Sequence, residues 1–325
     1  AYNMGVLPGD RWLACMPLSH VGGLSIVLRS AIYGTAVLIH PAFDEHAVNR
    51  ALREDGVTLL SVVPTMLQRM LDADDLPYPA AVRGVLVGGG PVTRELLLRA
   101  LDRGLPVLQT YGLSEAASQV TTLSPGDALA HAGSAGKPLI CTRVRIDAPE
   151  GEPGEILVQG ATVTAGYLGD AAATGRALRD GWLHTGDIGV MDDRGYLRIT
   201  DRKKDILVMS GGDNVSPARI EGALLADPTI AQAVVFGDGK PYLVAVLVPS
   251  EAARKEFPGA DALTKAMAAA VDAANKHLSV TERVRRFHLA PEPFTIENGQ
   301  LTPTQKVRRH RVKEAYAAAV EALYG

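Results

Sequence analysis

Residues 57–71 read VTLLSVVPTMLQRML, and this stretch decides the fold. A continuous run of valine and leucine stops at a proline, and leucines at helical spacing follow it. The same order recurs further along the chain. Strands are expected at Val57–Val63, Val85–Val87 and Val107–Thr110, with helices at Thr65–Leu71 and Thr93–Asp102. Strands alternating with helices over short connections predict βαβ units and a parallel sheet buried on both faces.

The pattern changes after about residue 142. Short strands between Gly, Pro and Asp are expected at Val144–Ile146, Gly154–Gln159 and Tyr196–Ile199. The last part of the chain predicts an α+β fold, with Ser216 as an N-cap before Pro217. A hairpin is expected from Ala231–Phe236 and Tyr242–Val248, and helices over Ala262–Leu278 and Arg308–Leu323. We therefore expect an α/β protein with an incomplete parallel-sheet large domain over 1–202, a β-rich subdomain at about 142–200, and a small α+β domain over 203–325.

Composition excludes several classes of protein. The chain has 325 residues and is 47% apolar, and 33 basic against 36 acidic side chains give a net charge of -3, which argues against a nucleic-acid partner. Two cysteines make neither a disulfide framework nor a four-thiolate zinc site, so a reducing cytoplasm is the expected setting. No apolar run is long enough for a transmembrane segment, and the N-terminus lacks a signal-peptide pattern. The absence of an initiator Met favours a chain that starts inside a longer protein.

Two groups of residues follow predicted strands, where parallel-sheet proteins bind ligands. Gly88-Gly89-Gly90-Pro91 lets a flat ligand approach the backbone, or is a plain tight turn. It is no GxGxxG fingerprint, so a Rossmann dinucleotide site has no support. Residues 111–115 read YGLSE, which offers a ring to stack on a base, a hydroxyl for a phosphate and a carboxylate for Mg²⁺. The alternative is a loop that leads into a helix.

Two more groups offer a carboxylate and cations. Residues 181–187 read GWLHTGD, where Asp187 on a tight turn would accept hydrogen bonds from a ribose diol or would only cap the turn. Residues 201–205 read DRKKD, and with the distant Lys306 they supply cations for a phosphate, or form a solvated surface cluster. The basic stretch 306–313 is either one face of a solvated helix or a contact for the phosphates of a bound ligand.

These motifs, with GGDNVSP at 211–217 and TPTQK at 302–306, occur in an order that resembles the adenylate-forming superfamily. That superfamily holds acyl- and aryl-CoA synthetases, luciferase-type enzymes and nonribosomal adenylation domains. The resemblance covers nearly the whole chain. It implies an AMP-forming ligase that activates a carboxylic acid with ATP and Mg²⁺ and then transfers it to CoA.

The resemblance also assigns roles to individual residues. Those implied to bind the nucleotide are Gly88, Gly89, Gly90 and Pro91 on one face of the adenine, Tyr111 and Gly112 on the other, Ser114 at the α-phosphate, and Asp187 and Arg202 at the ribose. Glu115 is implied to hold Mg²⁺, Lys306 to bridge carboxylate and phosphate during adenylation, and Lys204 to be the hinge of the small domain. His20 is implied to gate the acyl and pantetheine channel, with a structural histidine as the alternative. The implied acyl pocket is lined by Gly22, Gly23, Ser118 and Gln119.

Two departures from the family pattern matter. The phosphate loop of the type TSGTTGxPKG, which should precede PLSH at 17–20, is not among the 325 residues. We therefore expect the C-terminal part of an adenylating enzyme, with little ATP-dependent activation by this chain alone. Gln305 stands where many members have Gly, and the C-terminal part resembles long-chain acyl-CoA synthetases. The large domain resembles o-succinylbenzoate-CoA ligases, so the acid is expected to be aromatic or fatty.

Two other functions stay open on the sequence. A non-catalytic nucleotide-binding protein would keep the adenine and ribose contacts without the phosphate loop. A carrier-protein-loading adenylation domain would use the same motifs with another thiol. The acyl substrate and the oligomeric state do not follow from the sequence.

Overall fold

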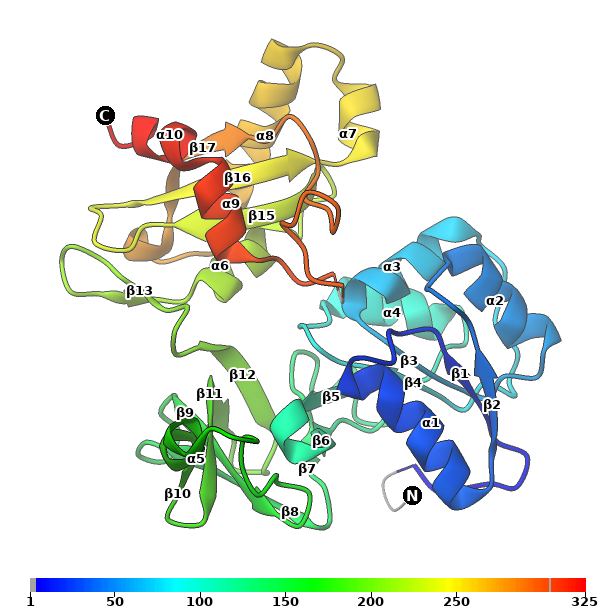
Figure 1. The fold of residues 1–325 in the computed structure, drawn as a ribbon. Coiled ribbons are helices and arrows are strands. Elements are labelled where there is room, and N and C mark those ends of the chain that lie inside the picture. The colour runs from blue at the N-terminus through cyan, green and yellow to red at the C-terminus, as the bar shows by residue number, and fades with distance from the viewer. Residues whose placement is uncertain (1–3, 304) are drawn as a thin grey trace. The chain divides into compact units, whose positions relative to one another are not determined.

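The computed structural model describes residues 4–303 and 305–325. It divides the chain into two compact units, Ala1–Ile199 (unit 1) and Thr200–Gly325 (unit 2). Unit 1 contains a seven-stranded sheet in the order β2-β1-β3-β4-β5-β6-β7 and a second sheet in the order β10-β11-β9-β8, with β12 beside β11. Figure 1 shows the helices and strands of both units, coloured along the chain from the N-terminus to the C-terminus.

The elements of the first sheet follow the predicted βαβ order. They are β1 (Arg11–Ala14), α1 (Val21–Tyr33), β2 (Ala36–Ile39), α2 (Glu45–Glu54), β3 (Leu59–Val62), α3 (Pro64–Ala73), β4 (Gly84–Val87), α4 (Arg94–Asp102), β5 (Val107–Leu113), β6 (Ser118–Thr122) and β7 (Lys137–Pro138). Strands β1 to β5 pair in parallel, whereas β5–β6 and β6–β7 pair antiparallel, so the sheet is mixed. The predicted helix start at residue 93 is one residue early, because Thr93 is the N-cap of α4 and accepts from the Leu96 N–H.

Both faces of this sheet are covered, which explains the continuous apolar runs in its strands. Alternate residues such as Leu13 and Val85 pack with α2, α3 and α4 in one core. The residues between them, such as Trp12 and Leu86, pack with Ile26 of α1 in another core on the opposite face. Figure 1 shows α1 on one side of the strands and the other three helices on the other side.

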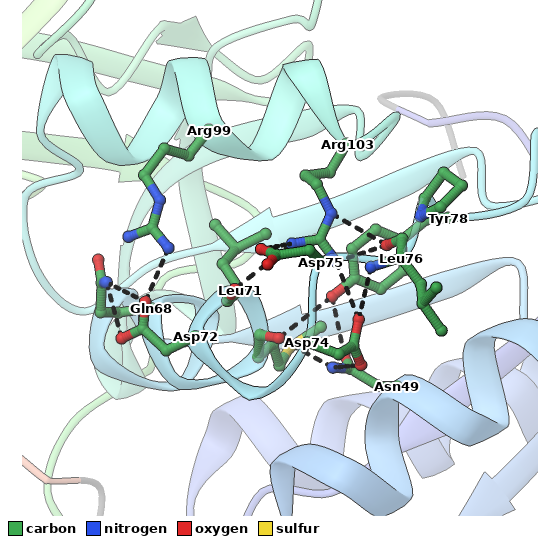
Figure 2. A network of polar contacts seen from close by, with 12 residues as sticks. Asn49, Gln68, Leu71, Asp72, Asp74, Asp75, Leu76, Tyr78, Arg99 and Arg103 are labelled. Carbon is green, nitrogen blue, oxygen red and sulfur yellow. Dashed lines mark hydrogen bonds and ion pairs between the residues drawn. The ribbon is translucent and has the colours of Figure 1, made fainter.

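A polar network ties together α2, α3 and α4 at one end of unit 1 (Figure 2). Asp74, which follows α3, accepts hydrogen bonds from Arg53, Asn49 and Arg103 at 2.8–3.0 Å. The guanidinium groups of Arg53 and Arg103 lie 4.8 and 5.4 Å from the ring centroid of Tyr78. One carboxylate therefore holds three elements in place.

The second sheet of unit 1 is antiparallel and confirms a β-rich part of the chain. Its elements, with the short helix that interrupts them, are β8 (Thr142–Asp147), β9 (Gly154–Gly160), α5 (Ala171–Ala177), β10 (Leu178–Arg179), β11 (Trp182–Met191) and β12 (Leu197–Arg202). Ile156, Val158 and Leu183 of this sheet share one core with Tyr111 and Val120 of β5 and β6. That shared core brings the two sheets of unit 1 together.

Unit 2 is a small α+β structure around the three-stranded sheet β15-β16-β17. Its elements after β12 are β13 (Leu207–Val208), β14 (Asn214–Val215), α6 (Pro217–Leu224), β15 (Ile230–Phe236), β16 (Leu243–Pro249), α7 (Glu251–Glu256), α8 (Ala260–Asn275), β17 (Val284–Leu289), α9 (Arg309–Ala315) and α10 (Ala317–Ala322). Helices α6 and α8 cover one face of the sheet, and α9 and α10 cover the other.

Three expectations for unit 2 are settled by the structure. Ser216 is the N-cap of α6, as predicted, and its hydroxyl accepts from the Arg219 N–H. The hairpin is present as β15 and β16, whereas the parallel partner β17 was not foreseen. The single helix predicted over 308–323 was wrong, because the chain breaks at Tyr316 between α9 and α10. No helix among the described residues combines the length and the apolar character that a membrane span requires.

Candidate adenylate-binding site

A hydrogen bond joins two of the predicted motifs in unit 1. The Tyr111 hydroxyl donates to Asp187 Oδ2 at 2.7 Å, across 76 residues of sequence. Both residues are only 7% exposed. The YGLSE and GWLHTGD segments therefore converge on one place, where β5 of the first sheet meets β11 of the second.

The local backbone of both residues differs from the expectation. Strand β5 runs on to Leu113, so Tyr111 and Gly112 lie inside a strand rather than in a loop after it. Asp187 also lies within a strand, β11, and not on a tight turn. The pairing of β11 with β9 shifts between His184 and Ile188, and this irregularity turns the Asp187 carboxylate toward Tyr111.

Gly112 is explained by crowding between strands. A Cβ at this position would lie 1.5 Å from the Ser118 carbonyl oxygen. Only glycine fits there, because β5 and β6 approach each other closely where their register shifts. The requirement for glycine at residue 112 is therefore structural whatever its part in nucleotide binding.

The glycine-rich segment lies beside the tyrosine strand. Strands β4 and β5 pair in parallel with Val87 opposite Gln109, so Gly88 follows β4 next to Thr110. Gly89 has φ +81° and is exposed, as is Pro91, while Gly88 and Gly90 are half-buried. The four residues thus form a backbone surface at the carboxyl end of the sheet, close in the fold to Tyr111.

Ser114 and Glu115 begin a short 3-10 helix (Ser114–Ala116) directly after β5. Ser114 is exposed, and the half-buried Glu115 accepts a hydrogen bond from the Tyr167 hydroxyl at 2.9 Å. That hydrogen bond to a carboxylate raises the pKa of Tyr167. The next two residues, Ala117 and Ser118, have φ of 50° and 95°, which is strained backbone for residues with a side chain.

His20 is the N-cap of α1, which agrees with the structural alternative and leaves the gating role a prediction. Its Nδ1 accepts a hydrogen bond from the Gly22 N–H at 3.1 Å. A Cβ on Gly23 would lie 2.4 Å from the Pro17 carbonyl oxygen. Glycine at residue 23 is therefore required by packing at the start of α1, in addition to any pocket that it lines.

Arg29 of α1 is a residue that the sequence interpretation missed. Its guanidinium donates to Ser25 and, at 3.5 Å, to the side-chain oxygen of Gln119, and it lies 4.9 Å from the ring centroid of Trp12. Burial lowers the pKa of Arg29. Its guanidinium makes no ion pair with any described residue, although a desolvated cation ordinarily has one. A lone arginine within the otherwise uncharged stretch 21–33 was the only signal that the sequence offered.

The remaining predicted residues belong to unit 2. Arg202 and Lys204 are exposed at the end of β12 and just after it. Lys306 is exposed on a hairpin, where its N–H donates to Thr302 Oγ1 and its carbonyl accepts from the Thr302 N–H. Thr304 of the TPTQK motif lies outside the described residues.

The basic stretch after Lys306 is not a uniformly solvated face. Arg309 donates to both carboxylate oxygens of Glu221 at 2.6 and 3.0 Å and to the Val235 carbonyl oxygen at 2.8 Å. Arg311 pairs with Glu314 within its own helix. Arg309 is thus bound by partners within unit 2 and is not part of a solvated face.

The acidic groups of unit 1 fit a metal that arrives with a nucleotide. Among the described residues there is no group of three or more His, Cys, Asp and Glu side chains that could hold a metal ion by themselves. Mg²⁺ bound to nucleotides typically takes one or two carboxylates and completes its shell with phosphates and waters. Glu115, half-buried beside the exposed Ser114 hydroxyl, offers that kind of oxygen ligand.

Comparison with known proteins agrees with this geometry. A family model described as AMP-binding enzyme matches residues 1–168, and one described as AMP-binding enzyme C-terminal domain matches residues 204–325. The chain belongs to the AMP-binding enzyme family, which confirms the resemblance to the adenylate-forming superfamily.

Individual relatives show which enzymes of this family the chain is similar to. The chain is 44% identical over 241 residues to a 2-succinylbenzoate--CoA ligase of Bacillus mycoides, an alignment that covers 72% of this chain and 50% of that ligase. O-succinylbenzoate coenzyme A synthetase (MenE) of Bacillus subtilis in complex with AMP is 34% identical with a TM-score of 0.82, over 96% of this chain and 62% of that one. A fatty acyl CoA synthetase of Mycobacterium tuberculosis is 28% identical with a TM-score of 0.64, over 97% and 61%. The chain spans about half the length of the curated relatives it matches.

Proposed function

We propose that this chain carries the adenylate-binding part of an AMP-forming acid–thiol ligase, which activates a carboxylic acid as an acyl-adenylate and transfers the acyl group to CoA. The observation that supports it most is the 2.7 Å hydrogen bond between Tyr111 and Asp187. It places a ring and a carboxylate from two distant motifs beside the Gly88–Pro91 backbone, as a bound adenosine would require.

The residue types fit the reaction. The substrate carboxylate attacks the α-phosphorus of ATP, a bond to the β-phosphate oxygen breaks, and pyrophosphate leaves. Mg²⁺, when bound, would neutralise charge on the phosphates. In our proposal the Ser114 hydroxyl donates to an α-phosphate oxygen, Glu115 orients the metal, and Asp187 accepts the ribose hydroxyls.

Residues of unit 2 would act in sequence on the same substrate. Lys306 would stabilise the charge that develops between carboxylate and phosphate in the first step, and Arg202 would contact the ribose. The CoA thiol then attacks the acyl carbon and AMP leaves, which requires Lys306 to withdraw. Rotation about Lys204 is our proposal for that movement.

The acid that the site favours carries a second carboxylate. Arg29 is a desolvated cation with no ion pair among the described residues, and it lies beside Gln119 of the proposed acyl pocket. A substrate carboxylate would supply the missing partner. The relatives named 2-succinylbenzoate--CoA ligase act on an acid with two carboxylates, so we propose an aromatic dicarboxylic acid of this kind over a fatty acid.

We also propose that the reaction takes place in the cytoplasm. Both cysteines are free thiols, Cys15 buried and Cys141 exposed. A free exposed thiol is ordinary in a reducing compartment and less so in an oxidising one.

Calorimetry with the 325-residue chain tests the nucleotide site. AMP and ATP should bind with similar affinities, because the contacts proposed here reach only the adenosine and the α-phosphate. Asp187→Ala should weaken AMP at least about tenfold, as expected for loss of hydrogen bonds to a charged acceptor. The matched control is Asp193→Ala, because Asp193 is an exposed aspartate just after the end of β11. No binding of AMP, or equal affinities in both variants, would refute the site.

Acyl transfer from a supplied acyl-adenylate tests the ligase activity. The adenylate of 2-succinylbenzoic acid and CoA should give thioester and AMP without any need for ATP. Arg29→Met should raise the KM for this adenylate while leaving that for the adenylate of a fatty acid unchanged. AMP binding without thioester formation would instead identify a non-catalytic nucleotide-binding protein.

A further inference from the structure

The irregularity in β11 leaves backbone groups that the sheet cannot satisfy. His184 pairs with Leu157 of β9, and Ile188 pairs with Glu155, so three residues of β11 lie opposite Ile156 alone. Gly186 in this bulge has φ +72°, a conformation that glycine adopts without strain. Buried N–H groups at such a position need other acceptors.

Side chains supply those acceptors. The Gly186 N–H donates to Glu155 Oε1 at 3.0 Å, and the Asp187 N–H donates to Thr185 Oγ1 at 3.1 Å. The Thr185 hydroxyl in turn donates to the Ile156 carbonyl oxygen at 2.7 Å. The bulge is therefore held against β9 at two points, by Glu155 at the Gly186 N–H and by the Thr185 hydroxyl at the Ile156 carbonyl oxygen.

Glu155 is the only charged side chain among these acceptors, and it is 9% exposed. Its Oε2 lies 3.3 Å from His184 Nδ1, but Arg179 lies closer to that nitrogen, at 2.8 Å. Because a guanidinium only donates, the shorter contact makes Nδ1 an acceptor, and the ring is no strong partner for Glu155. The hydrogen bond from the Gly186 N–H links the carboxylate of Glu155 directly to the backbone of the bulge.

We infer that Glu155 is a positioning residue for Asp187, an inference that rests on the proposed role of Asp187 at the ribose. The Gly186 N–H lies one residue before Asp187, so an acceptor that fixes it also fixes the direction in which the Asp187 side chain leaves the strand. That direction is the one in which Asp187 meets the Tyr111 hydroxyl at 2.7 Å. Glu155 touches no nucleotide itself; it acts through the backbone of the bulge.

The test compares AMP with 2′,3′-dideoxyadenosine 5′-monophosphate, which lacks only the diol. The wild-type chain should bind AMP at least about tenfold more tightly than the dideoxy nucleotide. Glu155→Met, of similar length but without an acceptor, should reduce this ratio to less than about threefold. Its affinity for the dideoxy nucleotide should stay within about twofold of wild type. Glu155→Gln keeps an oxygen for the Gly186 N–H and should retain the wild-type ratio.

Two further variants separate positioning from general support of the sheet. Val48→Ala truncates a fully buried residue of α2, in the core that contains neither Tyr111 nor the bulge, and it should lower stability while preserving the ratio. Glu155→Asp keeps the charge, but its shorter side chain should not reach the Gly186 N–H, so the ratio of the two affinities should fall as in Glu155→Met. This variant therefore tests the inference even if the methionine variant does not fold. A wild-type ratio in Glu155→Met or Glu155→Asp, or an equal loss for both nucleotides, would overturn the inference. If the wild-type chain itself does not distinguish the two nucleotides, the proposed function fails, and the inference fails with it.

Discussion

Replacing Asp74 by asparagine should destabilise unit 1 and alter its response to acid. The carboxylate accepts hydrogen bonds from Arg53 at 2.8 and 3.0 Å, from Arg103 at 2.9 Å and from Asn49 at 3.0 Å (Figure 2). The Arg53 guanidinium, with burial opposing it, lowers the pKa of Asp74 from 3.8 to about 2. Because the folded state prefers the ionised form, this stabilisation is complete above the ordinary pKa of 3.8.

The size of the effect follows from that pKa. Each pKa unit is worth about 1.4 kcal/mol, so the lowering from 3.8 to about 2 gives roughly 2.5 kcal/mol as an upper value. The Asp74 side chain is 26% exposed, and solvent screening reduces the figure to about 1.5–2 kcal/mol. Arg53 and Arg103 also donate to the Leu76 carbonyl oxygen, so both guanidinium groups keep a hydrogen-bond acceptor when the Asp74 charge is removed. The stabilisation should disappear as the pH falls from 3.8 through about 2.

Urea unfolding followed by tryptophan fluorescence measures this directly, because both tryptophans, Trp12 and Trp182, lie in unit 1. At pH 7 Asp74→Asn should lower the midpoint by about 0.5–1 M urea, given a slope of about 2–3 kcal/mol/M for a unit of this size. Near pH 2.5 the difference from wild type should shrink to less than half. The control is Asp72→Asn, since Asp72 is 54% exposed and, among the described residues, pairs only with Gln68 and Arg99. Equal effects of the two variants at pH 7, or a difference that persists at pH 2.5, would refute the electrostatic argument.

Two further predictions concern packing. Gly112→Ala should destabilise unit 1 by about 3 kcal/mol or prevent folding, because its Cβ would collide with the Ser118 carbonyl oxygen, whereas Gly175→Ala in open space should be neutral or slightly stabilising in the same urea assay. Equal midpoints for the two glycine variants would contradict the close approach of the strands. Thiol titration with an aromatic disulfide should modify Cys141 alone in the native chain, because burial raises the pKa of Cys15 to about 12. Both thiols should react in denaturant, and rapid reaction of Cys15 without denaturant would show that the core beside it opens.

Much of the fold could be predicted because local signals and tertiary packing agree. Pro64 opens α3 directly after β3, and Thr93 caps α4, so apolar period and helix-start signals coincide there. Strand β17 was missed, because its sequence VRRFHL alternates poorly and it is held by parallel pairing with β16. The break at Tyr316 was missed for a similar reason. Its side chain packs with Phe294 and His288, and these contacts are invisible to helical periodicity.

The candidate site, like the fold, could be predicted only in part. The residue types in YGLSE and GWLHTGD indicated candidate side chains, since a carboxylate, a hydroxyl and an aromatic ring can be recognised in the sequence. How the backbone presents them was not predictable. Whether Asp187 lies on a turn or in a bulged strand depends on Glu155, which is 32 residues earlier and supplies the acceptor for the bulge. Arg29 was overlooked because a lone arginine in a helix is ordinary until its burial and lack of an ion pair are known.

The convergence of Tyr111 and Asp187 makes the proposed nucleotide site a property of the core between the two sheets of unit 1. Tyr111 packs among Val120, Ile156 and Leu183, and its hydroxyl reaches Asp187 only while those residues hold β5 and β11 in contact. A substitution in this core can therefore disturb the proposed adenosine contacts without changing any residue that we propose to bind the nucleotide. The converse also holds: a nucleotide that bridges the Gly88–Pro91 backbone and the Asp187 carboxylate ties the first sheet to the second. Binding of AMP should for that reason protect both sheets of unit 1 together against unfolding, and not only the segments in contact with the ligand.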